Sequence, residues 1–292
     1  MDMDEILRMV DELFDENKPK EAEHLLVQSL ETANAQGDGA ACLQILNELI
    51  GYYRQTSEKD KLLSVIHESL NLAEYLGLKG SIPYATTALN AANGYRAIGD
   101  RENSLKYYQI TEKIYRERLL PDDMLMAGLF NNMSLLYQEF QDYKKAENYL
   151  LSALDIVKSN HAGFEIAVTY ANLANTCILA KDYEMVRKYA LKAIECFKAR
   201  NLYDAHYCAA LSALGMCLFE EQKYEEAEKL FAEGMEIVEN SLGQNLQYER
   251  LKENRDTCHR ARKKQEANSA EKTDDFRKPY QADTGLLISR RY

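Results

Sequence analysis

Large and small apolar residues recur along this chain at intervals of about 40 residues. Aligning residues 131–157 with residues 171–197 superimposes a large apolar residue, a smaller residue after it, a turn, and a second series of small and large residues. The same register extends in both directions. The large apolar position then recurs at spacings of 40, 42, 42, 40 and 41 residues, as Met9, Leu49, Ala91, Met133, Leu173 and Leu214. A fixed period of this length predicts a repeated structural unit.

A second apolar series follows the turn in each unit, and its spacing is that of a helix. In each unit a position that is mostly small is followed by a bulky position four residues later and by a small residue seven residues later. These spacings place all three on one face of a helix with 3.6 residues per turn. The bulky position is occupied by Leu26, Ile66, Tyr108, Leu150, Ala190 and Phe231. Each unit is therefore predicted to be a pair of helices packed face to face.

The turn residues agree with this division. Pro19, Pro83 and Pro121 precede or begin predicted helices, where a missing N–H costs least. Six glycines fall between helices, where a left-handed cap is expected: Gly37, Gly77, Gly80, Gly99, Gly163 and Gly243. We predict helices at about 4–15, 18–35, 38–56, 59–76, 81–98, 101–118, 122–140, 143–160, 162–180, 183–200, 202–221, 224–240 and 244–267. The last has only a narrow apolar stripe, so we expect it to cap the stack, and we assign 268–292 to a linker and tail.

These columns resemble the tetratricopeptide repeat in its longer form of about 40–42 residues, as in kinesin light chains. The resemblance covers six units, at about 3–36, 43–77, 85–119, 127–160, 167–200 and 208–240, within a domain of residues 1–267. It implies an all-α fold in which six helix pairs and a capping helix form a right-handed superhelix, or α-solenoid. Such a superhelix has a concave face lined by the first helices, and we expect the function to lie there.

The expected concave stripe is rich in asparagine. An asparagine amide both donates and accepts hydrogen bonds, so it can pair with the backbone of an extended peptide whatever its sequence. In the kinesin-light-chain-like repeats an asparagine directly before the large apolar residue contacts the main chain of a bound peptide, and Asn90, Asn132 and Asn172 match that position. The candidate peptide-binding residues are Asn47, Asn90, Asn93, Asn131, Asn132, Leu135, Asn172, Asn175 and Met216. Alternatively, the asparagines bridge neighbouring first helices and rigidify the stack.

The two interpretations differ in their consequences. If the asparagines bind a ligand, replacing Asn132 and Asn172 together by alanine should abolish binding and leave the melting temperature nearly unchanged. If they bridge helices, the melting temperature should fall. Lys and Arg are scarce on the stripe, which argues against recognition of the acidic C-terminal tails that chaperone-binding tetratricopeptide domains bind.

Enzymatic and metal-binding motifs are lacking. The five histidines are scattered, and neither HExxH, GxGxxG, GxxxxGK[ST] nor GxSxG occurs. The six cysteines form no CxxC pair and lie in apolar helical contexts, so we read them as reduced packing thiols. We expect no catalytic residues, no metal and no cofactor. With 13 Gly, 4 Pro and no Trp in 292 residues, too few turn residues are present for an all-β chain.

The charge is distributed unevenly. Residues 1–254 carry 26 Lys and Arg against 41 Asp and Glu, whereas residues 255–292 carry 10 against 6. An acidic body argues against nucleic acid as a partner. No apolar stretch is long enough for a membrane span and the first residues are acidic, so we expect a cytoplasmic protein with no membrane partner. The exposed ends of solenoids often pair, so an oligomer is compatible with the pattern.

Three interpretations of the tail remain open. The sequence GLLISRRY (285–292) is similar to the opening of a nucleotidyltransferase-like domain that follows tetratricopeptide repeats in some bacterial proteins. That would make this chain the recruiting or regulatory half of a larger protein. Alternatively, the apolar and basic tail lies in the groove of its own or a neighbouring molecule, or it is a disordered end. Our principal prediction is a non-catalytic scaffold that binds a peptide or protein segment in its concave groove.

Overall fold

The computed structural model describes residues 3–16 and 18–276 of the chain, and this part consists of α-helices without strands. Twelve helices begin and end within three residues of their predicted bounds. No helix in these two ranges is long and apolar enough to cross a membrane. The helices are α1 (Met3–Asp15), α2 (Pro19–Gln36), α3 (Gly39–Thr56), α4 (Lys59–Tyr75), α5 (Ile82–Ala97), α6 (Arg101–Arg118), α7 (Met124–Glu139), α8 (Tyr143–Ser159), α9 (Gly163–Leu179), α10 (Tyr183–Lys198), α11 (Ala205–Glu220), α12 (Tyr224–Leu242) and α13 (Leu246–Phe276).

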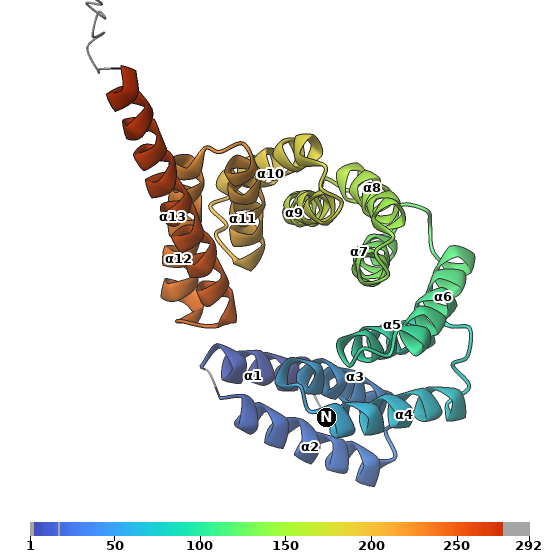
Figure 1. The fold of residues 1–292 in the computed structure, drawn as a ribbon. Coiled ribbons are helices and arrows are strands. Elements are labelled where there is room, and N and C mark those ends of the chain that lie inside the picture. The colour runs from blue at the N-terminus through green and yellow to red at the C-terminus, as the bar shows by residue number, and fades with distance from the viewer. Residues whose placement is uncertain (1–2, 17, 277–292) are drawn as a thin grey trace, which may run out of the picture.

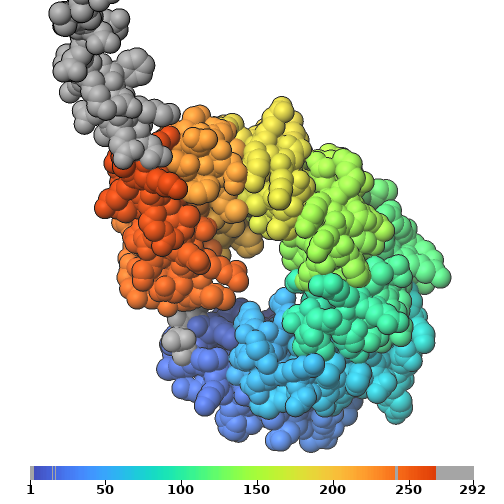
Figure 2. Space-filling view, in the orientation of Figure 1, coloured from blue at the N-terminus to red at the C-terminus, as the bar shows by residue number. Residues whose placement is uncertain are grey.

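The helices form two concentric layers along an arc (Figure 1). The first helix of each pair lies on the inner side of the arc and the second on the outer side. In the space-filling view the arc curves around a central opening (Figure 2). The predicted all-α superhelix of stacked pairs is confirmed, and its concave wall is built from the first helices.

The predicted packing columns account for the core. Every bulky and small position of the second helices is buried, from Ala22 and Leu26 in α2 to Phe231 and Gly234 in α12. Five of the six large apolar positions of the first helices are also buried. Met9 is the exception, since 41% of it is exposed, while Ile6 and Val10 on the same helix are buried. In the other units the large apolar residue is covered by the preceding unit. In the described residues no helix packs against α1 and α2 on that side, so Met9 stays exposed.

The turns within the units use the left-handed backbone conformation, mostly without glycine. The residue before the N-cap of the second helix has a positive φ at Gly99, but also at Gln141 (61°), Lys181 (60°) and Gln222 (62°). The expectation was wrong for Gly163, which begins α9 with no positive φ. A Cβ at that position would lie 1.8 Å from Nη2 of Arg200, so the missing side chain makes room for this guanidinium.

Helix α13 covers the last repeat and then continues beyond it. Leu251 and Cys258 are buried on its inner side, as the apolar stripe predicts. The helix ends at Phe276 rather than near 267, so residues 268–276, assigned to the linker, are helical. This stretch contains no Gly or Pro, and a helix needs no packing partner to run on for a few turns. Its last turns extend past α12 in Figure 1. The segment 285–292, on which the tail hypotheses depend, lies outside the described residues.

Candidate functional site

The nine predicted site residues all lie on helices of the concave wall. None of them is buried: Asn175 and Met216 are exposed, and the other seven are half-buried. They lie on α3, α5, α7, α9 and α11. In each of these helices the large apolar residue of the repeat packs into the core, so the predicted site residues near it lie toward the helix surface. The hydrogen bonds of their amides divide the seven asparagines among these residues into two groups.

One group forms hydrogen bonds with side chains of a neighbouring helix. Between α7 and α9, Nδ2 of Asn172 donates to Oδ1 of Asn131 at 3.1 Å, and Nδ2 of Asn131 approaches Oγ1 of Thr169 at 3.4 Å. Two turns further along the same two helices, Nε2 of Gln138 donates to Oγ1 of Thr176 at 2.9 Å. These contacts join two consecutive repeats by polar bonds at the concave surface.

Two more asparagines serve the packing of the N-terminal half. Nδ2 of Asn47 in α3 donates to Oγ1 of Thr87 in α5 at 3.2 Å, and its Oδ1 is buried with no partner in the described residues. Oδ1 of Asn93 accepts a hydrogen bond of 2.5 Å from the hydroxyl of Tyr108, whose pKa is raised to about 12 by burial. We refer to Asn47, Asn93, Asn131 and Asn172 as the bridging asparagines.

The other group keeps free amide groups. Nδ2 of Asn132 donates only to the carbonyl of Gly128 in its own helix, at 3.0 Å, which leaves its Oδ1 unoccupied. The amides of Asn90 and Asn175 have no hydrogen-bond partner in the described part of the chain. Asn90, Asn132 and Asn175 lie on three successive first helices, α5, α7 and α9. We refer to these three as the open asparagines.

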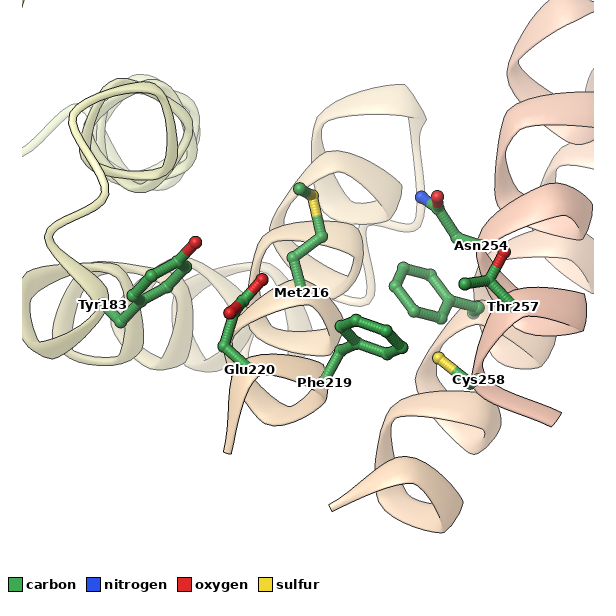
Figure 3. A pocket seen from close by; sticks show the side chains of 8 residues that line it. Tyr183, Met216, Phe219, Glu220, Asn254, Thr257 and Cys258 are labelled. Carbon is green, nitrogen blue, oxygen red and sulfur yellow. The ribbon is translucent and has the colours of Figure 1, made fainter. Parts of the chain in front are cut away.

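Two adjacent hollows mark the C-terminal end of the concave wall. The first has a volume of about 190 Å³ (Figure 3) and the second about 170 Å³, and Met216 lines both. The first hollow is lined by Tyr183, Met216, Phe219, Glu220, Phe231, Asn254, Thr257 and Cys258. The second is lined by Asn175, Ile178, Cys208, Ala209, Ser212, Ala213, Met216, Gln247, Arg250 and Leu251.

Helix α13 is therefore a wall of the groove as well as a cap. The sequence interpretation missed its contribution because it considered only the apolar stripe. A signal was present: Gln247, Arg250, Asn254 and Thr257 follow one another at spacings of three and four residues, which places them on one polar face of a helix. All four line a hollow.

Comparison with known proteins identifies the repeats. Models of the tetratricopeptide repeat match residues 83–159, 125–199 and 208–245, which together span more than half of the chain. The chain belongs to the tetratricopeptide repeat family. No curated protein matches this tetratricopeptide repeat protein significantly.

Solved structures share its fold at low sequence identity. The apo form of RapI has a TM-score of 0.67 and 17% identity, over 91% of this chain and 72% of RapI. NprR in complex with its cognate peptide NprX has a TM-score of 0.63 and 15% identity, over 84% of this chain and 70% of NprR. The repeats of a putative kinesin light chain from Podosopora anserina have a TM-score of 0.58 and 12% identity, over 68% of this chain and 95% of that one. At these identities the likeness concerns the fold.

Several charged and nucleophilic groups of this tetratricopeptide repeat protein are engaged in ion pairs or buried in the packing. Between α5 and α7, Nη1 of Arg96 pairs with Oε1 of Glu139 at 2.9 Å, and Arg101 lies 3.8 Å from the same carboxylate. Burial raises the pKa of Cys177 to about 12 and that of Cys258 to about 11, so both thiols stay protonated near neutral pH. Within residues 3–16 and 18–276, no cluster of His, Cys, Asp and Glu could hold a metal ion.

Proposed function

We propose that this chain is a non-catalytic scaffold that binds an extended peptide, or an extended segment of a partner protein, along its concave face. The observation that carries the proposal is the set of open asparagines. Three successive inner helices each present an amide with unoccupied hydrogen-bonding groups beside the groove.

The spacing of these helices suits an extended chain. Packed helices lie about 8–10 Å apart, and an extended strand advances about 3.3 Å per residue. An amide on every inner helix therefore meets about every third residue of a peptide that crosses the helices. An amide can donate to a carbonyl and accept from an N–H, so these contacts fix the main chain without reading its side chains.

The low-identity fold relatives are compatible with this proposal. NprR, which shares the fold, was solved with its cognate peptide. Recruitment of a following nucleotidyltransferase-like domain gains no support, because the residues that suggested it lie outside the described ones.

The test is an unbiased selection of binders followed by matched variants. A display library of random 12-residue peptides is selected on the full chain, and the affinities of the enriched peptides are measured by fluorescence polarisation. The double variant Asn90→Ala/Asn132→Ala should weaken them at least tenfold, because two main-chain contacts are lost. Asn148→Ala, an exposed asparagine on the outer helix α8, is the control and should leave the affinities unchanged.

Melting temperatures of both variants should stay within about 2 °C of the parent, because neither removes an inter-helix bond. Enriched peptides that bind the double variant as tightly as the parent would show that the open asparagines do not hold the ligand.

A further inference from the structure

The second hollow has an unpaired cation on its rim. Arg250 is exposed and has no hydrogen bond or ion pair in the described part of the chain. Its neighbours on α13 differ, since Lys252 pairs with Glu249 and Arg255 with Asp256. A guanidinium presents a planar fork of donors that matches the two oxygens of a carboxylate. Arg250 is thus free to bind one from a ligand in the groove.

The first hollow suits a large apolar side chain. Phe219, Phe231 and Cys258 supply apolar surface to a space of about 190 Å³, and Figure 3 shows Asn254 and Thr257 reaching toward it from α13. A protein cavity of about 150 Å³ can hold a benzene molecule, so there is room for a leucine or phenylalanine side chain. Met216, 38% exposed, separates the two hollows, and its flexible thioether can adapt to the shape of a neighbour.

The charges of the two hollows favour one orientation of a bound ligand. Glu220 lines the first hollow and pairs with no cation in the described ranges, so it disfavours a second carboxylate there. Ser212, in the second hollow with Arg250, and Glu220 are eight residues apart on α11. That is about 12 Å of helix, or three to four residues of extended chain. The two hollows can therefore be filled by neighbouring residues of one short segment.

We propose that the C-terminal end of the groove anchors a peptide through a carboxylate on Arg250 and a large apolar side chain, within about three residues of it, in the first hollow. This inference rests on the proposed function and adds to it. The open asparagines hold a main chain of any sequence, whereas these two contacts set the register of the peptide and select its residues.

The carboxylate can come from a chain terminus or from an acidic side chain, and three peptide pools separate these sources. All are fluorescein-labelled pools of 12-residue peptides of Gly, Ala and Ser, with Leu at one of the last three positions, and 12 extended residues are long enough to reach from the hollows to the open asparagines. The first ends in a free carboxylate, the second in an amide, and the third in an amide with one Asp within three residues of Leu. Binding to the full chain is measured by fluorescence polarisation.

The first or the third pool should bind at least tenfold more tightly than the second. Arg250→Gln should reduce the preferred pool to the level of the amide pool. Lys264→Gln, which removes the same charge from an exposed position of α13 that lines neither hollow, should have no effect. Asn254→Phe places a ring in the first hollow. It should abolish the difference in affinity between the preferred pool and the same pool with Gly in place of Leu.

Equal binding by the three pools, binding by none, or an unchanged preference in Arg250→Gln would overturn the inference. The melting temperature of each variant shows whether it is folded. A different result would contradict the proposed function: binding of the preferred pool that depends on Arg250 but is unaffected by Asn90→Ala/Asn132→Ala. If binding depends on those asparagines but not on Arg250, only the anchor is wrong.

Discussion

The division into bridging and open asparagines predicts that substitutions at two adjacent positions differ in their effect on stability. Asn131→Ala removes the 3.1 Å bond from Asn172 and the 3.4 Å contact with Thr169, both between α7 and α9. Each such bond contributes about 0.5–1.5 kcal/mol net, and alanine returns at most about 0.7 kcal/mol of helix propensity. We therefore expect a loss of about 1–2 kcal/mol. Asn132→Ala removes only a bond within its own helix, so its effect should stay within about 0.5 kcal/mol.

Urea denaturation followed by circular dichroism measures both variants. At about 2–4 °C per kcal/mol, Asn131→Ala should also lower the melting temperature by about 2–8 °C. Adding Asn172→Ala to Asn131→Ala should cost little more, because their shared bond is already lost, and a double-mutant cycle should give a coupling of about 1 kcal/mol. Equal stability of the two single variants, or strictly additive effects of Asn131 and Asn172, would refute the bridge.

Three further predictions concern the turns, the charges and the thiols. Lys181→Gly should stabilise the protein by about 0.5–1 kcal/mol in urea denaturation, because glycine adopts the positive φ without the Cβ clash; an unchanged or lower midpoint would contradict this. Arg187 and Lys223 lower the pKa of Glu221 to about 2, so the stabilisation from its charge is present above pH 4.5 and is lost as the pH falls toward 2. The difference in urea midpoint between the parent and Glu221→Gln should shrink over that interval, and a constant difference would count against the ion pair. A thiol reagent at pH 8 should modify Cys196 first in the native protein, since it alone among the six thiols is half-buried and the others are buried; fast reaction of another thiol would indicate local opening.

The repeats could be predicted well from the sequence because equivalent positions are buried in every stacked helix pair. This shared burial produces the period of apolar residues. The prediction from the sequence failed where a neighbouring unit is missing or where a helix continues without packing. Met9 has the residue type of a core position but no helix packed beyond it. The end of α13 was placed too early because the apolar stripe marks where a helix packs, whereas the backbone of α13 stays helical to Phe276.

The roles of the asparagines depend on a residue in the next unit. Asn47 and Asn131 stand two residues before the large apolar position, and each meets a threonine four residues before that position in the following unit, Thr87 or Thr169. Comparing positions between adjacent units would have found these pairs from sequence. The groove residue Arg250 could be recognised only as one of several cations on α13, because its lack of a partner depends on the packed structure.

The junction between α5 and α7 lacks such a bridge. Leu89 and Leu129 occupy the positions at which Asn47 and Thr87, or Asn131 and Thr169, meet on either side. In the described residues, the polar link from α5 to α7 is the ion pair of Arg96 and Glu139. Charge pairs weaken as salt screens them, whereas amide–hydroxyl bonds between neutral groups do not. We therefore expect rising salt to weaken the contact between α5 and α7, to loosen the arc at this joint and so to change the width of its opening.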